Sequence, residues 1–135
     1  MPKNKRVIVD TNLWISFLLT KNLSALDILF QNTQITLLFN KALLDEFVEV
    51  SNRTKFKKYF SSEDLQVLIY SIKKHAEFIL VSSEVNECRD PKDNFLLSLA
   101  KDGKANHLIS GDKDLLELKK FGKTNILIYT KFIKA

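Results

Sequence analysis

The chain has 135 residues, of which 45% are hydrophobic and 27% charged, and its 21 lysines and arginines against 16 aspartates and glutamates give a net charge of +5. One folded domain spanning residues 1–135 is therefore expected, whereas disordered, collagen-like, disulfide-rich and zinc-stabilised classes do not fit three glycines, two prolines, one cysteine and two histidines. The charge excess favours a surface that binds a polyanion, with solubility alone as the alternative.

Apolar runs in the sequence stay shorter than the roughly 18 to 20 residues of a membrane span. The first residues lead directly into a strand pattern rather than into the apolar core of a signal peptide. We therefore expect a cytoplasmic protein without membrane contact.

Short apolar runs alternate with helical patterns along the chain. Strands are predicted at 6–10, 34–39, 78–81, 107–110 and 126–129. Helices are predicted at 13–19, 24–31, 41–52, 61–75, 91–101 and 112–120. This alternation predicts an α/β fold with a mostly parallel five-stranded sheet and helices on both faces.

Acidic residues mark places where these predicted elements meet. Asp10 and Asp112 follow the carboxyl ends of two strands, and Asp93 lies in the first turn of a helix between them. Glu46 lies near the apolar face of an earlier helix. Ionised carboxylates beside a core are costly, and several together raise one another's pKa. A bound Mg²⁺ or Mn²⁺ removes both problems, so the pattern predicts a divalent-metal site.

Each acid also has a purely structural interpretation. Asp93 and Asp114 suit the dipole in the first turn of a helix, and Asp10 and Asp112 suit the capping position before one. Glu46 shares its helix with other acids, so its position is only modestly favoured. These alternatives stay open for each residue taken alone, but the joint arrangement is more specific than any member.

Four segments carry a resemblance to a known family. They are V-I-V-D-T-N, L-L-D-E-F, R-D-P-K-D-N and L-I-S-G-D-K-D-L-L, which lie between Val7 and Leu116. In these segments the chain resembles the PIN-domain family of metal-dependent ribonucleases, which includes the VapC-type toxins of bacterial toxin–antitoxin pairs. The resemblance implies a three-layer α/β/α sandwich.

The resemblance also implies a site and an activity. Metal-binding, catalytic carboxylates are expected at Asp10, Glu46, Asp93 and Asp112, with outer-shell roles for Thr11, Ser110 and Asp114. One or two Mg²⁺ or Mn²⁺ ions would promote the attack of water on an RNA phosphodiester, leaving 5′-phosphate and 3′-hydroxyl ends. The expected role is the toxin of a toxin–antitoxin pair, whose partners are a cognate antitoxin protein or a second copy of the chain.

One basic segment suits RNA binding, because its cations interleave with aromatic residues. The cations are Arg53, Lys55, Lys57 and Lys58. Cations could follow phosphates while an exposed ring stacks on a base. The alternative is a solvated loop whose aromatic side chains pack on the core.

Two other functions compete with the ribonuclease interpretation. A phosphatase of the haloacid-dehalogenase kind also places an aspartate at a strand end, but it needs a second aspartate where this chain has Asn12. A non-catalytic PIN-like module that only binds RNA or a partner is the stronger alternative.

Overall fold

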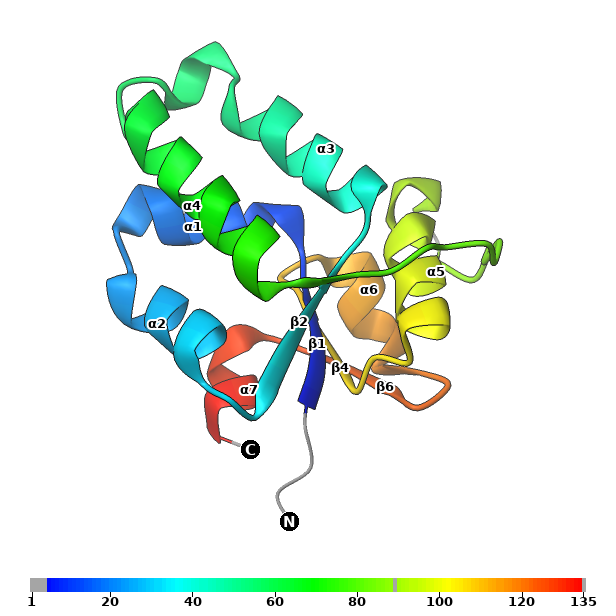
Figure 1. Ribbon diagram of the computed structural model, residues 1–135. Helices are drawn as coiled ribbons and strands as arrows, with labels where there is room; N and C mark the ends of the chain where they lie inside the picture. Colours follow the sequence, from blue (N-terminus) through cyan, green and yellow to red (C-terminus); the bar gives the residue numbers. More distant parts are fainter. Residues whose placement is uncertain (1–4, 89, 135) are drawn as a thin grey trace.

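The computed structural model describes residues 5–88 and 90–134, and residues 1–4, 89 and 135 lie outside the described part. Within it, six strands join in one sheet (Figure 1). They are β1 (Lys5–Val9), β2 (Ile35–Phe39), β3 (Glu77–Phe78), β4 (His107–Ile109), β5 (Lys120–Phe121) and β6 (Thr124–Leu127).

Helices connect the strands. The α-helices are α1 (Thr11–Thr20), α2 (Leu23–Gln31), α3 (Lys41–Ser51), α4 (Ser62–His75), α5 (Asn94–Gly103), α6 (Lys113–Leu118) and α7 (Tyr129–Lys134). Two short 3₁₀ turns, Thr54–Phe56 and Pro91–Asp93, lead towards α4 and α5. In the part of the chain that is described, no helix is long and apolar enough to cross a bilayer.

The sheet has the order β3-β2-β1-β4-β6-β5 and is parallel except for β5. β1 lies between β2 and β4, with Val7 opposite Leu37 on one side and Val9 opposite Ile109 on the other. Along the chain, strands are therefore added to β1 first on the side of β2 and later, beginning with β4, on the other side. In open α/β sheets such a reversal point is where ligands bind, beyond the carboxyl ends of the strands.

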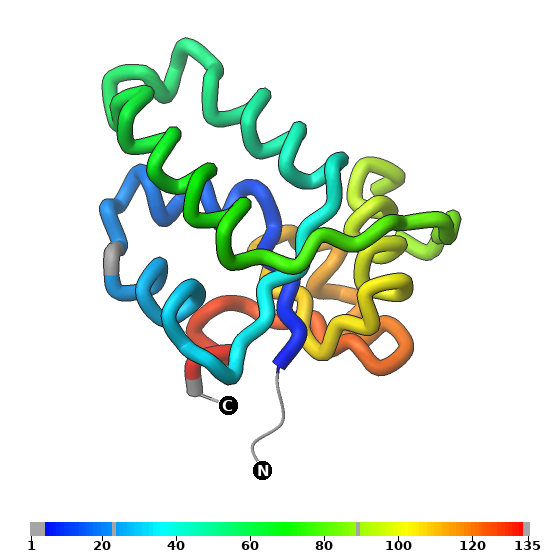
Figure 2. Tube along the Cα trace, in the orientation of Figure 1, coloured from blue at the N-terminus to red at the C-terminus, as the bar shows by residue number. Residues whose placement is uncertain are grey.

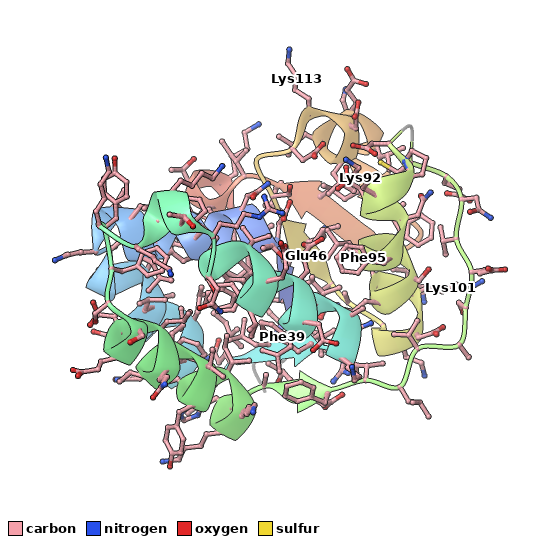
Figure 3. The ribbon with its side chains drawn as sticks, turned by 90° about the horizontal axis from the view of Figure 1, so that it is seen from above. Phe39, Glu46, Lys92, Phe95, Lys101 and Lys113 are labelled. Carbon is pink, nitrogen blue, oxygen red and sulfur yellow. The ribbon has the colours of Figure 1, made fainter. Side chains whose placement is uncertain are left out.

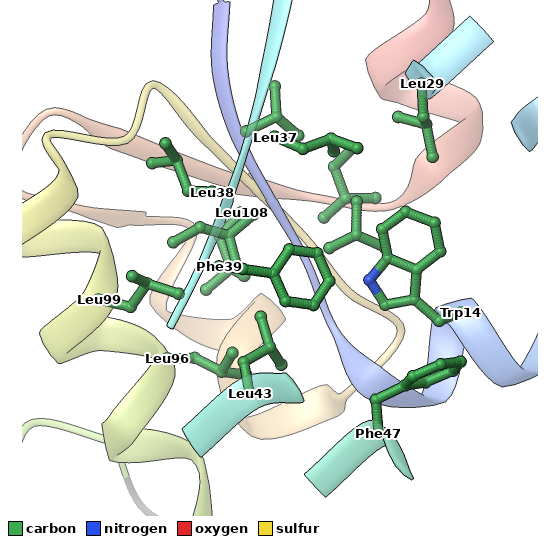
Figure 4. Close-up of a cluster of buried hydrophobic side chains, with 14 of the residues drawn as sticks. Trp14, Leu29, Leu37, Leu38, Phe39, Leu43, Phe47, Leu96, Leu99 and Leu108 are labelled. Atoms are coloured by element: carbon green, nitrogen blue, oxygen red, sulfur yellow. The ribbon is translucent and has the colours of Figure 1, made fainter. Parts of the chain in front are cut away.

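Helices cover both faces of the sheet, giving an α/β/α sandwich (Figure 1). The Cα trace in Figure 2 shows α1, α2 and α4 on one side, α5 and α6 on the other, and α3 above the carboxyl ends of the strands. Val7, Ile8 and Val9 have no exposed surface, as expected for a central parallel strand. The same core holds Trp14, whose ring lies near that of Phe39 (Figure 4). On its other side Trp14 stacks on the partly buried Phe30.

The sequence prediction of five strands missed β5. This strand has two residues and pairs antiparallel with β6 across a turn in which Gly122 adopts φ of +57°. Two residues are too few to show an alternating pattern, so the helix predicted over 112–120 was extended through it. The observed α6 ends at Leu118.

The C-terminal end was also mispredicted. Residues 126–129 were expected to form the last strand, but β6 ends at Leu127 and Tyr129 begins α7. Tyr129 packs edge-on against Phe17, and Phe132 packs edge-on against His107. These long-range contacts favour a short helix over the strand that the aromatic and β-branched residues suggest. Likewise the strand predicted at 78–81 is shortened to Glu77–Phe78.

Asn40 joins the sheet to the helix that carries Glu46. It follows β2, is buried, and its side-chain oxygen accepts a hydrogen bond from the backbone N–H of Leu43 at 2.9 Å. Removing this cap by Asn40→Ala is expected to destabilise the protein by about 1 kcal/mol. Urea unfolding measures the change, and Asn40→Ser, which can keep the cap, should lose less. Equal losses for the two variants would contradict the capping role.

Candidate metal centre

Asp10 lies at the reversal point of the sheet. It follows β1, is only 6% exposed, and its backbone N–H donates to the carbonyl of Ile109 at the end of β4. Its Oδ1 accepts from the N–H of Asn12, which caps α1. Burial is the main cause of a raised pKa for this carboxyl, with the charge of Asp112 adding to it. The capping interpretation of Asp10 is therefore correct, but it engages only one of the two oxygens.

Ser110 connects the first carboxylate to the last. Its buried hydroxyl donates to Asp10 Oδ2 at 2.7 Å and accepts from the backbone N–H of Asp112 at 3.0 Å. Asp112 caps α6, because its Oδ1 accepts from the N–H groups of Asp114 and Leu115. One serine thus aligns the ends of β1 and β4.

Asp93 behaves differently from these two caps. It precedes α5 but makes no side-chain capping bond there, and its Oδ2 is buried without a hydrogen-bond donor among the described residues. Burial is the largest cause that raises the pKa of this carboxyl to about 7. The charge of Asp112 and a side-chain hydrogen bond with it raise the pKa further, and the charges of Asp10 and Asp90 add to this. The structure therefore brings Asp10, Asp93 and Asp112 within one another's electrostatic field.

Glu46 approaches the same edge from α3. Thr11, which is buried beside Asp10, donates its hydroxyl hydrogen bond to Glu46 Oε1. Figure 3 looks onto this end of the molecule and shows Glu46 near its middle, between α3 and α5. Thr11 therefore holds the glutamate beside the start of α1, one residue from Asp10.

A second acidic grouping shares Asp93. Carboxylate oxygens of Asp90, Asp93 and Asp114 all lie within 4.8 Å of one another. Asp90 also caps the 3₁₀ turn before α5, since its Oδ1 accepts from the N–H of Lys92. The i, i+3 spacing of Asp90 and Asp93 was the signal that could have placed both on one side of the turn.

The carboxylates around Asp93, from both acidic groupings, are chemically suited to a divalent cation. Oxygen ligands from carboxylates suit Mg²⁺ and Mn²⁺. Asp93 has a buried carboxylate oxygen without a donor among the described residues, and burial and neighbouring negative charge raise its pKa, so additional positive charge would stabilise its ionised form. A cation at this position would supply it.

The basic segment predicted to bind RNA lies elsewhere, beyond the far end of α3 (Figure 1). Arg53 pairs with Glu49 at 3.0 Å, and Lys55 and Lys58 lie over the rings of the aromatic residues that follow them. Phe56 and Phe60 stack on each other, and Phe60 is buried. The packing interpretation therefore holds for Phe60, while Tyr59 stays half exposed.

The fold and the acidic residues at the carboxyl ends of the strands define an α/β/α protein with a carboxylate cluster at the reversal point of its sheet. A family model described as PIN domain matches residues 6–114. An uncharacterized protein of Methanocaldococcus jannaschii is 30% identical over 118 residues, which cover 84% of this chain and 75% of that protein. No solved structure matches the chain. The chain belongs to the PIN-domain family, and its class is accordingly that of nucleases, which are hydrolases.

Proposed function

We infer that the protein is an endoribonuclease that depends on Mg²⁺ or Mn²⁺. The observation that carries this inference is Asp93, whose carboxyl is crowded by three other acids and has a buried oxygen without a donor among the described residues. Asp10, Asp93 and Asp112 are the principal ligands in this proposal. A bound ion would supply Lewis-acid activation of water and stabilisation of the leaving oxygen.

The remaining residues position these groups. Ser110 fixes the orientation of Asp10 through the hydrogen bond to Oδ2. Thr11 holds Glu46, which would orient the attacking water or share a second ion. Asp90 and Asp114 lie beside Asp93 and would share the ion or orient water bound to it. Such supporting contacts typically contribute 10- to 100-fold to metal affinity or activity.

The experiment is cleavage of a labelled single-stranded RNA by the purified protein with Mn²⁺ or Mg²⁺, beside a sample in EDTA. We expect cutting only with metal, giving 5′-phosphate ends. RNA binding without cleavage under every metal condition would instead support the non-catalytic binding module.

We further propose that the nuclease acts as a toxin restrained by an antitoxin protein. A groove of about 440 Å³ lies between α1, α2 and α4, with the apolar side chains of Phe17, Leu26 and Phe30 in its lining. An apolar antitoxin segment, or a second copy of the chain, would suit it.

Growth arrest on expression of the protein, absent for an inactive variant, tests the toxin role. A strictly monomeric sizing profile would count against a homodimer.

The segment around Lys57 and Lys58 remains a proposed RNA contact. Both lysines are exposed, although Lys58 lies over the Tyr59 ring. Reversing both to glutamate is expected to weaken RNA binding. It should also make the fall of log K with log salt less steep by about 1.4, because each phosphate contact on a single strand contributes about 0.7 to that slope. Anisotropy titrations over a salt series measure this slope. An unchanged slope would exclude the segment from the RNA path.

A further inference from the structure

A hollow lined by three lysines and two glutamates lies near the amino-terminal ends of β4 and β6, at the end of the strands opposite to the acidic cluster. It encloses about 830 Å³ between the end of α5, the segment 84–87 and the turn that joins β5 to β6. Its lining includes Lys101, Lys104 and Lys123. The volume lies within the range of about 300 to 1,000 Å³ that accommodates small ligands.

The side chains of the hollow suit a nucleotide in several ways. The three lysines are exposed and can donate to phosphate oxygens. Phe121, half-buried on β5, presents a ring on which a base can stack. Glu84 and Glu87 also line the hollow, and carboxylates accept hydrogen bonds from the amino groups of bases.

The hollow is connected to the acidic cluster by one helix. α5 begins directly after Asp93 and ends at Gly103, between Lys101 and Lys104. Its ten residues span about 15 Å at 1.5 Å per residue. Figure 1 shows α5 running from the edge that holds the acids to the edge near the β5–β6 turn. A strand a few nucleotides long can reach from one site to the other.

The cations here are better placed for RNA than those of the basic segment. In the latter, Arg53 is paired with Glu49, and Lys55 and Lys58 cover aromatic rings. The ion pairs identified within the described residues involve none of the three lysines of the hollow. Lys101 lies near Asp102, whose pKa its charge helps to lower, but all three lysines are exposed and can contact a polyanion.

We propose that this hollow binds the single-stranded RNA substrate at a distance from the acidic cluster, with Lys101, Lys104 and Lys123 on its phosphates. The inference rests on the proposed ribonuclease function, which supplies the substrate. It makes the hollow a second contact on the RNA path that anchors one end of the strand while the other reaches the acids.

The test replaces all three lysines by glutamine and measures RNA binding by anisotropy in EDTA, so that cleavage does not interfere. A 12-nucleotide RNA is expected to bind on the order of 100-fold more weakly at about 50 mM salt, and its salt slope should fall by about 2, at about 0.7 for each lost phosphate contact. The wild-type protein should bind the 12-nucleotide RNA more tightly than a 4-nucleotide RNA, and this difference in affinity should be smaller in the triple variant.

The matched control removes the same charge elsewhere. Lys73, Lys74 and Lys131 are exposed on α4 and α7, so their replacement by glutamine tests net charge alone. Equal weakening in the two triple variants, or an unchanged slope in the first, would overturn the proposal. Wild-type protein that binds through the hollow but cuts no RNA would leave the proposal standing and overturn the ribonuclease function.

Discussion

Asp10→Asn is expected to lower metal-dependent RNA cleavage by more than about 100-fold, a larger loss than supporting residues around metals usually give. The replacement removes a charged ligand at the point where β1 and β4 meet. Asn keeps an oxygen that can accept from the N–H of Asn12, so the cap of α1 can persist. Burial raises the pKa of the Asp10 carboxyl, so its charged form is costly in the folded protein. The neutral Asn side chain avoids this cost, which favours retention of the fold.

Cleavage rates at saturating Mn²⁺ measure this effect, with circular dichroism as the check on folding. Glu63→Gln is the matched control, because Glu63 is an exposed acid in the first turn of α4 and belongs to neither acidic grouping. The control should cut RNA at the wild-type rate. Full activity in Asp10→Asn would remove Asp10 from the site.

Asp93→Asn is expected to stabilise the metal-free protein above pH 7 while abolishing its response to metal. The Asp93 carboxyl has a pKa of about 7 in the folded protein against an ordinary value of 3.8. The folded state therefore holds this proton more tightly than the unfolded chain does. The resulting stabilisation is complete below pH 3.8 and is lost as the pH rises through 7.

Thermal unfolding in EDTA at pH 5 and pH 8 measures this prediction. The wild-type protein should lose more stability than Asp93→Asn between the two values. Asp102 and Glu77, whose pKa values are lowered by hydrogen bonds, act in the opposite direction but are common to both proteins. The difference between wild type and variant therefore reports Asp93 together with its effect on the neighbouring acids. A variant that keeps the same offset at both pH values would refute the crowding of this carboxyl.

Metal should reverse the order of stability. A cation that binds only the folded state stabilises it in proportion to the logarithm of its concentration over Kd. Millimolar Mn²⁺ is therefore expected to raise the melting temperature of wild type at pH 8 and to raise that of Asp93→Asn much less. Equal shifts in both proteins would place the ion away from Asp93.

The prediction of the α/β class succeeded because the central strands are short apolar runs that end in polar residues. Val7, Ile8 and Val9 are buried on both faces, so their sequence needs no alternation to be recognised. The sequence predicted that Asp10 and Asp112 each follow a strand, and they meet at one end of the sheet because these strands, β1 and β4, pair in parallel. The missed elements, β5 and α7, are too short to carry a period of their own.

Local sequence was therefore sufficient for most of the strand and helix alternation and for the positions of aspartates just after strands and at helix starts, because burial and capping leave patterns within a few residues. Several features needed the folded chain: Ser110 between two carboxylates, Thr11 on Glu46, Asp90 beside Asp93, and the lysine-lined hollow at the other end of α5. Each joins residues from elements that are separated in the chain or whose side-chain directions depend on packing. Such contacts are set by strand order and helix packing, which no local pattern specifies.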